Sequence, residues 1–144
     1  MIRKALSRDI EKLIPLVRSL WPDHREDEYP FILQSYIENS KSCAYIAIDG
    51  TVVVGIVFGS LRYDYVEGCE TSPVGYLEGV YVSKDYRLQG IGRMLVTTCE
   101  QWAKGQGCHE FASDCELANT ESLHFHLGIG FHEENRIICF KKKL

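Results

Sequence analysis

Residues 85–95, "DYRLQGIGRML", have the spacing in this chain that most clearly indicates chemistry. Gly90 and Gly92 lie two positions apart, and an apolar run of helical period follows them. A glycine-rich turn that opens a helix exposes backbone N–H groups without intrahelical partners, and the helix dipole adds positive potential. The segment therefore predicts an anion-binding turn. It has neither the Gly-Lys-Ser/Thr ending of a P-loop nor the third glycine of a dinucleotide fingerprint.

Four further residues have types that suit the binding of a charged ligand. Glu78 interrupts an otherwise apolar strand, so it needs a polar partner or a wet cleft. Asp114 closes the predicted strand "HEFASD", where it is either a cleft residue or a turn-capping aspartate. Tyr65 lies in a polar loop, whereas Trp21 taken alone is best explained as the last core residue of the first helix.

The elements that must position these residues follow in the order β-α-α-β-β-β-α-β-α-β. The pattern predicts a mixed α/β fold with six to seven strands and about four helices, an antiparallel meander first and alternating strands and helices afterwards. Ser7 is expected to cap the first helix, and a second helix is expected over about 29–39. Asp49-Gly50 predicts a type I′ hairpin turn, and "RIICF" predicts a last strand.

Length and composition indicate one domain over residues 1–144 with a sizeable core. The net charge of −4 argues against a general nucleic-acid binder and is compatible with a cationic ligand. The six cysteines form no CxxC pair, no metal-like spacing is present, and no apolar stretch has the length of a membrane span. We therefore expect a soluble cytoplasmic protein with reduced thiols, no metal and no membrane partner.

The longer pattern "LEGVYVSKDYRLQGIGRMLV" followed by "NTESLHFHLGIGF" resembles the GCN5-related N-acetyltransferases, the GNAT superfamily. The resemblance covers nearly the whole chain and implies acetyl-coenzyme A as cosubstrate. In that family the turn wraps the cofactor's pyrophosphate, and the end of the preceding strand pairs with the pantetheine arm. Gly79 fits a β-bulge that would free a backbone N–H near Val80 or Tyr81 to polarise the thioester carbonyl. The cofactor-binding candidates are Val80, Tyr81, Val82, Arg87, Leu88, Gln89, Gly90, Ile91, Gly92, Arg93 and Asn119.

A narrower resemblance is carried by "YDYVEGCETSPVGYLEGVYV", "EFASD" and the tail "ICFKKK", which are similar to segments of the aminoglycoside 6′-N-acetyltransferases. It implies transfer of acetyl to the 6′-amine of a polycationic acceptor, whose site should be lined by carboxylates and aromatic rings. The acceptor-side residues that the resemblance indicates are Trp21, His24, Tyr65, Glu70, Glu78 and Asp114.

The candidate catalytic residues are Asp114, Glu78 and His126. Asp114 is either the base or a group that only fixes the ammonium while water carries the proton away. Many family members have a tyrosine four residues before the Gly-Phe pair, and it protonates the coenzyme A thiolate; this chain has His126 there. His126 is either a hydrogen-bonding or proton-donating group, or a histidine packed under the last strand.

Two other functions fit the same residues. One is an acetyltransferase for another small amine, such as a polyamine or a peptide N-terminus, and the other is a non-catalytic acyl-coenzyme A-binding module. The related enzymes are commonly dimers, and an apolar strand "RIICF" near a sheet edge invites pairing or exchange between chains. We therefore also expect a homodimer.

Overall fold

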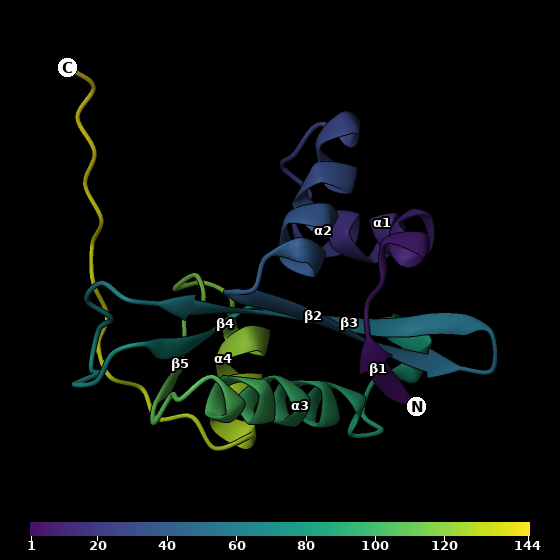
Figure 1. Cartoon of the computed structure of the whole chain (residues 1–144). Coiled ribbons are helices and arrows are strands. Elements are labelled where there is room, and N and C mark those ends of the chain that lie inside the picture. Colours follow the sequence, from purple (N-terminus) through teal and green to yellow (C-terminus); the bar gives the residue numbers. More distant parts are fainter.

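A computed structural model describes residues 1–144, and it contains a central sheet with helices on both faces (Figure 1). The sheet has five strands in the order β1-β2-β3-β4-β5, which is also their order in the chain. The strands are β1 Ile2–Lys4, β2 Ser42–Asp49, β3 Val52–Arg62, β4 Val74–Val82 and β5 Phe111–Ser113. The helices are α1 Ile10–Leu20, α2 Tyr29–Glu38, α3 Ile91–Gly105 and α4 Thr120–Gly128.

The strand pairing confirms the predicted mixed sheet. Strands β1 to β4 form an antiparallel meander, and β5, which returns after α3, pairs with β4 in parallel. The prediction of six to seven strands is wrong, because the sheet ends at β5. The helix predicted over about 29–39 is confirmed as α2.

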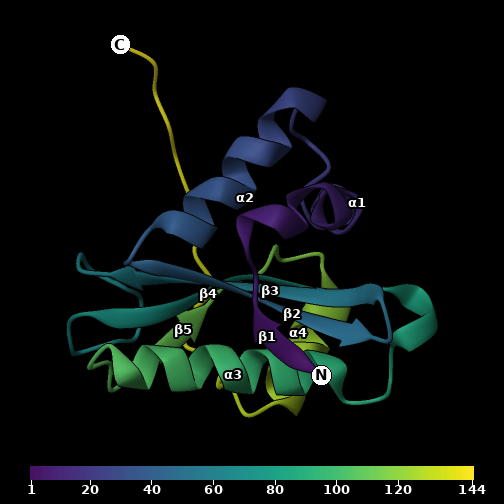
Figure 2. The same cartoon turned by 45° about the vertical axis from the view of Figure 1, so that its right-hand side comes forward.

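The two faces of the sheet bury separate apolar clusters. Helices α1 and α2 cover one face, and α3 and α4 cover the other (Figures 1 and 2). Leu13, Val17 and Leu33 pack with Ile56 and Phe58 on the first face. On the second face Leu95, Val96 and Cys99 of α3 pack against Cys43, Val57 and Leu77. The sheet therefore holds the two pairs of helices on opposite sides of β4, the strand that carries Glu78.

Two local predictions are corrected by the backbone. In the β2–β3 hairpin, Asp49 pairs with Val52, so the turn residues are Gly50 and Thr51. Gly50 has a φ of 61° and Thr51 has none in the positive range, which is the pattern of a type II′ turn and not of type I′. Ser7 does not cap α1, because its hydroxyl accepts a hydrogen bond from Gln34 and the chain passes through a 3₁₀ turn before the helix begins.

The buried carboxylate at the start of α1 belongs to Asp9. The guanidinium of Arg3 donates to both of its oxygens at 2.8 Å, and the Leu6 N–H donates to Oδ2 at 2.8 Å. These contacts, led by the Arg3 hydrogen bonds, lower the pKa of Asp9 to about 2. The ion pair fastens β1 to the turn that leads into α1.

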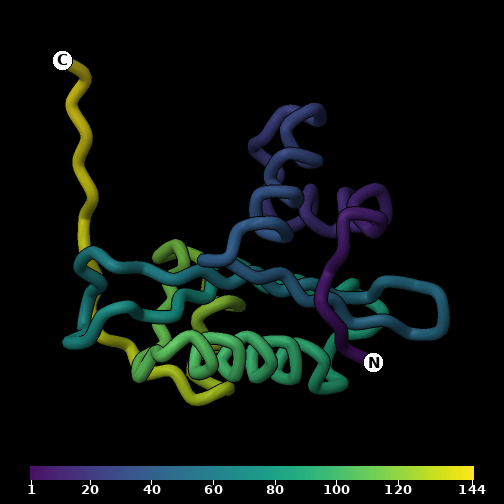
Figure 3. Tube along the Cα trace, in the orientation of Figure 1, coloured from purple at the N-terminus to yellow at the C-terminus, as the bar shows by residue number.

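The predicted last strand, residues 136–140, is not part of the sheet. The segment after Phe131 is exposed and runs away past the β3–β4 loop (Figure 3). Asn135 donates to Glu67 in that loop, and the Glu134 side chain lies against Gly68. These contacts lead the chain away from β5, and they leave Ile137, Ile138 and Phe140 exposed.

No helix of the protein combines the length and the apolar character needed to cross a membrane. The structure also contains no group of three or more His, Cys, Asp and Glu side chains arranged to hold a metal ion.

Candidate active site

The site lies where β4 and β5 separate. Their parallel pairing ends at Leu77 and Ser113, whereas β4 continues to Val82 alongside β3. The β3–β4 register shifts here, because Phe58 pairs with Gly79 and Gly59 pairs with Leu77, which leaves Glu78 as the extra residue of a β-bulge. The bulge expected at Gly79 is therefore confirmed. On its β5 side, the backbone from Glu78 to Val82 has no strand partner, which creates a free edge inside the sheet.

Glu78 is held at this bulge by two polar side chains of β3. Its Oε1 accepts hydrogen bonds from Ser60 Oγ at 2.5 Å and from Arg62 Nη2 at 3.0 Å, and its Oε2 accepts from Arg62 Nη2 at 3.1 Å. The carboxylate in the apolar strand thus has the polar partners that its position requires.

Tyr76 joins this group to Asp114. The Tyr76 hydroxyl donates a hydrogen bond to Asp114 Oδ2, and the Arg62 guanidinium lies over the Tyr76 ring with Cζ 3.4 Å from the centroid. Burial and the Asp114 hydrogen bond raise the pKa of Tyr76, so the phenol stays neutral. Asp114 follows the last residue of β5, is exposed and has no cationic partner in the protein. Of the two carboxylates, only Asp114 is free to meet a cation.

Trp21 forms the aromatic wall beside Glu78. Its ring stacks on Phe58 with centroids 5.0 Å apart and on Tyr36 at 6.1 Å. A Cβ on Gly79 would lie 2.8 Å from Trp21 Cζ2, so only glycine lets the indole lie against the bulge. Trp21 therefore closes the core under α1 and also borders the bulge, and its contact with an acceptor stays a prediction.

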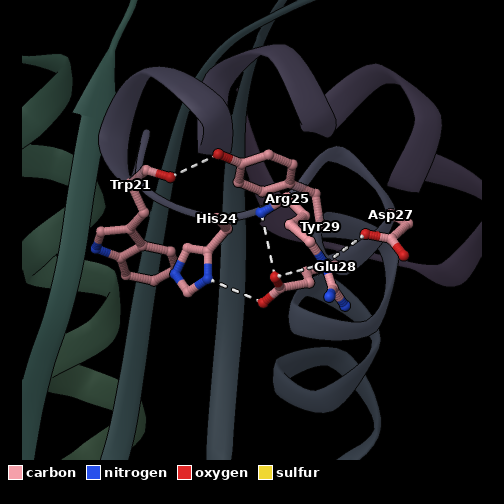
Figure 4. A network of polar contacts seen from close by, with 6 residues as sticks. All are labelled: Trp21, His24, Arg25, Asp27, Glu28 and Tyr29. Carbon is pink, nitrogen blue, oxygen red and sulfur yellow. Dashed lines mark hydrogen bonds and ion pairs between the residues drawn. The ribbon is translucent and has the colours of Figure 1, made fainter.

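His24 extends the same wall toward the start of α2. Figure 4 shows its ring between the Trp21 indole and the Glu28 carboxylate. Its Nδ1 lies 3.3 Å from Glu28 Oε2, and the Tyr29 hydroxyl donates to the Trp21 carbonyl at 2.7 Å. Hydrogen bonds from the Arg25 backbone N–H and from His24 lower the pKa of Glu28. This network fixes the α1–α2 connection over the site.

The turn between β4 and α3 is built as an anion cradle. Leu88 and Gly90 both have positive φ, 61° and 80°, and the first helical hydrogen bond is Met94 N–H to the Gly90 carbonyl at 3.0 Å. None of the consecutive backbone N–H groups from Leu88 to Arg93 donates to a protein acceptor. A Cβ built on Gly90 meets no protein atom within 4 Å, so the space above the turn is open. Such a row of N–H groups at a helix N-terminus is suited to phosphate oxygens.

Three of the predicted cofactor side chains have contacts that shape the cradle. Arg87 Nε donates to the Val82 carbonyl at 2.9 Å, and its Nη1 lies 3.6 Å from Glu121 of α4. Arg93 donates to the Gly128 carbonyl at 2.6 Å. The Asn119 side chain caps α4 by accepting the Ser122 N–H at 3.1 Å. These contacts connect the end of β4, α3 and α4 around the free edge.

His126 lies at the base of the split between β4 and β5. Its Nε2 is 2.8 Å from Ser113 Oγ, and its Nδ1 is 2.7 Å from the Ser122 carbonyl, to which it donates. The ring also packs against Phe131, with centroids 5.2 Å apart. Both ring nitrogens thus have protein partners, and the Ser113 hydroxyl also donates to the Leu77 carbonyl at 3.2 Å.

Two predicted residues are not brought into this group. Tyr65 is 79% exposed in the β3–β4 loop, where its hydroxyl donates to Glu67. Glu70 is exposed in the same loop, and its backbone N–H donates to Glu110 at 2.9 Å, away from Glu78 and Asp114. In this conformation, neither side chain contacts Glu78 or Asp114.

Comparison with known proteins decides the family. Residues 10–131 match the model of the acetyltransferase (GNAT) family. The chain is 43% identical over 130 residues to an aminoglycoside N(6′)-acetyltransferase type 1 of Acinetobacter genomosp. 13, covering 90% of this chain and 88% of that protein. The chain belongs to the GNAT family.

Two solved structures have the same fold over the full chain. One is AAC(6′)-Iy in complex with a bisubstrate analogue, CoA-S-monomethyl-acetylneamine, with a TM-score of 0.95 and 33% identity over 100% of this chain and 98% of that one. The other is the apo aminoglycoside 6′-N-acetyltransferase AAC(6′)-IG of Acinetobacter haemolyticus, also with a TM-score of 0.95 and 33% identity, covering 100% and 99%.

Within this GNAT site, the sequence-based prediction missed Arg62 and Tyr76. Their spacing was a partial signal, which becomes informative only once the register of β3 against β4 is known. Ser60 and Arg62 lie two apart at the end of one strand, and Tyr76 and Glu78 lie two apart in the next. Residues two apart point to the same face of a strand, so paired strands bring the four side chains together.

Proposed function

We propose that this GNAT chain is an aminoglycoside 6′-N-acetyltransferase, which transfers an acetyl group from acetyl-coenzyme A to the 6′-amine of the antibiotic by direct attack. Relatives and structures that carry this name match nearly the whole chain. The observation that carries the proposal most directly is Asp114, an exposed carboxylate without a cationic partner at the mouth of the splayed strands.

The residues present fit acetyl-coenzyme A, which supplies the acetyl group as a reactive thioester. The backbone N–H groups from Leu88 to Arg93 would bind its pyrophosphate, since they have no acceptor in the protein. The free edge of β4 over Val80–Val82 would pair with the amide groups of its pantetheine arm. The β-bulge at Glu78, in β4 itself, supports the proposal that a backbone N–H near Val80 or Tyr81 polarises the thioester carbonyl.

The acceptor side is proposed to bind the aminoglycoside through Asp114, with the aromatic wall of Trp21 and His24 against its rings. In the reaction the amine nitrogen forms a bond to the acetyl carbon, and the carbon–sulfur bond breaks. The amine loses a proton to Asp114 or to water that Asp114 orients, and the leaving thiolate gains one. We assign the second proton to the imidazolium form of His126: its Nε2–H would pass a proton to the Ser113 hydroxyl as that hydroxyl gives its own proton to the thiolate, which leaves His126 neutral.

The test is acetyl transfer to a matched set of acceptors. Tobramycin and kanamycin A carry a 6′-amine, and a gentamicin component with a 6′-hydroxyl in its place does not. An amine attacks a thioester far more readily than a neutral alcohol, so we expect turnover of the first two and little of the third. Product NMR should place the acetyl group on the 6′-nitrogen. Acetylation of another ring amine, or turnover of spermine alone, would overturn the assignment and support the other-amine alternative.

The proposal includes a homodimer and a cytoplasmic location. Residues 136–140 carry exposed apolar side chains, and β5 is an edge strand with no neighbour on its outer side. Both features favour pairing of this segment with a second copy of the chain. Light scattering should give a dimer for the full chain and a monomer for a chain ending at Glu133. A monomeric full chain would contradict the dimer.

A further inference from the structure

Arg62 is a cation built into the side of the cleft where a polycationic acceptor is expected. Its guanidinium donates to both oxygens of Glu78 and lies over the Tyr76 ring, whose hydroxyl donates to Asp114. The fork-like pairing with one carboxylate and the stacking on an aromatic ring are both contacts that lysine cannot reproduce. Arg62 is therefore fixed between the two acceptor-side carboxylates.

The charges around this group are few. From β3 and β4 the ionic groups are Arg62 and Glu78, and from the residue after β5 there is Asp114. Two phenols, Tyr36 of α2 and Tyr76, also face the group; burial and then Glu78 raise the pKa of Tyr36 to about 12, so both stay neutral. The ammonium of Lys41 lies instead over the Tyr63 ring, 5.0 Å from its centroid. On the α1–α2 side, Glu28 pairs with Arg25 and His24, so of the carboxylates around this group only Asp114 has no cationic partner.

We propose that Arg62 is a positioning residue that sets the charge of the acceptor cleft: by neutralising Glu78 it leaves Asp114 as the single anchor for the acceptor amine. The inference rests on the proposed function and adds a residue that determines how the amine is bound and deprotonated. Glu78 then serves mainly to hold Arg62 and the bulge, with Ser60 as its third partner.

This arrangement resolves a conflict in the chemistry. Carboxylates attract the ammonium form of the acceptor, but only the neutral amine attacks the thioester. Two uncompensated carboxylates would bind the substrate more tightly and raise the pKa of its amine, so less of it would be reactive near neutral pH. With one carboxylate beside one fixed guanidinium, the site still attracts the ammonium form, but the pKa of the bound amine rises less.

The test is the pH profile of kcat for tobramycin at saturating concentration, which reports groups in the bound complex, with Arg62→Met, which keeps a long apolar side chain without the charge. The acidic limb should move up by about one pH unit, because removal of one nearby charge favours the ammonium form. At pH 7 and low salt, KM should fall severalfold and become more sensitive to salt. Arg18→Met is the matched control, since Arg18 also pairs with a glutamate and its side chain is similarly exposed, 48% against 43%.

Glu78→Gln keeps the test decisive if Arg62→Met is poorly folded: it leaves the Arg62 charge uncompensated, so the acidic limb should move down, and an unmoved limb would overturn the role of Arg62. The double variant Arg62→Met/Glu78→Gln removes both charges, so the net charge of the cleft returns to that of the wild type and the acidic limb should return with it. Arg62→Lys should leave the limb near its wild-type position. An unmoved limb in folded Arg62→Met, or a shift equal to that of Arg18→Met, would overturn the role of Arg62. Failure of the wild-type chain to acetylate any aminoglycoside would instead overturn the proposed function.

Discussion

The proposed cofactor side and the proposed acceptor side of this protein use different kinds of binding group. On the proposed cofactor side the candidate binding groups are backbone N–H groups in one continuous turn, from Leu88 to Arg93, and one free strand edge. On the acceptor side they are side chains from α1, β3, β4 and the residue after β5, in contact with one another through Arg62 and Tyr76. The proposed cofactor site is thus main chain close in sequence, and the proposed acceptor site is side chains distant in sequence.

This difference predicts how each side responds to substitution. A backbone cradle depends on the conformation of the turn, so only residues with special φ angles are critical to it. A side-chain cleft depends on individual charges, and single conservative replacements should change its chemistry while the fold persists. Closely related enzymes can therefore keep one cofactor and still differ in acceptor.

The largest expected effect concerns Asp114. Asp114→Asn keeps the shape and removes the charge that holds the ammonium and receives or directs its proton. We expect kcat for tobramycin to fall by roughly a hundredfold or more, with little change in the dissociation constant of coenzyme A. A loss confined to KM would assign Asp114 to binding alone. Wild-type values of both kcat and KM would show that Asp114 is not part of the acceptor site, and the contrast between the cofactor side and the acceptor side would then fail.

A second prediction concerns Asp9, which belongs to neither side but anchors the helix that carries Trp21. The pKa of Asp9 in the folded protein is lowered to about 2, so its ionised form adds stability above its ordinary pKa and this stability is lost as the pH falls toward 2. Asp9→Asn should cost about 2 kcal/mol of unfolding free energy at pH 7, roughly thirtyfold in the folding equilibrium.

Urea unfolding at pH 7 and near pH 2.5 measures this, and the difference between Asp9→Asn and wild type should shrink at the lower pH. Glu26→Gln is the control, because its ion pair with Arg18 is exposed and should contribute much less. Coenzyme A affinity of the folded Asp9→Asn protein should be unchanged. An equal cost at both pH values would show that the ionised form of Asp9 is not the source of stability.

The third prediction tests the backbone cradle with a matched pair of glycines. Gly90 and Gly107 have similar positive φ, 80° and 92°, and a Cβ on either meets no protein atom within 4 Å. Alanine at each position should therefore carry a similar backbone strain of about 1 kcal/mol. Only Gly90→Ala places a methyl group over the turn, and it should weaken coenzyme A binding by about tenfold in calorimetric titration. Equal affinities for both variants would contradict the cradle.

The smallest expected effect is that of Tyr76→Phe. The change removes the hydroxyl that orients Asp114 and keeps the ring under Arg62. We expect kcat/KM for tobramycin to fall by only a few fold, because Asp114 is exposed and water can replace the lost phenol hydrogen bond to its carboxylate. Tyr63→Phe is the control, since that ring contacts Lys41 in the β3–β4 loop and not Asp114. If both variants match wild type, the Tyr76 hydroxyl does not orient Asp114.

The same contrast explains what could be predicted from the sequence. The turn at residues 85–95 could be predicted because its local backbone geometry requires glycine next to a helix start. Gly90 has the expected positive φ. The bulge at Gly79 could be predicted for a similar local reason. Arg62 and Tyr76 could not be placed, because their partnership depends on the register of β3 against β4, which periodicity alone does not fix.

Other errors have equally physical causes. The strand expected at residues 136–140 has the right composition, but a strand needs a partner, and the contacts of Glu134 and Asn135 with the β3–β4 loop lead the chain elsewhere. Ser7 has the right type for a helix cap, yet it lies in the 3₁₀ turn before α1, where its hydroxyl accepts a hydrogen bond from Gln34 of α2. Both errors arise from tertiary contacts that override local preference.

A crystal structure with coenzyme A and tobramycin bound together would test the central claim most directly. We predict pyrophosphate oxygens on the N–H groups from Leu88 to Arg93, the 6′-amine beside Asp114, and Arg62 still paired with Glu78. A pyrophosphate held by side chains away from this turn, or an amine that displaces Arg62 and pairs with Glu78, would contradict the division between a backbone cofactor site and a single-carboxylate acceptor site.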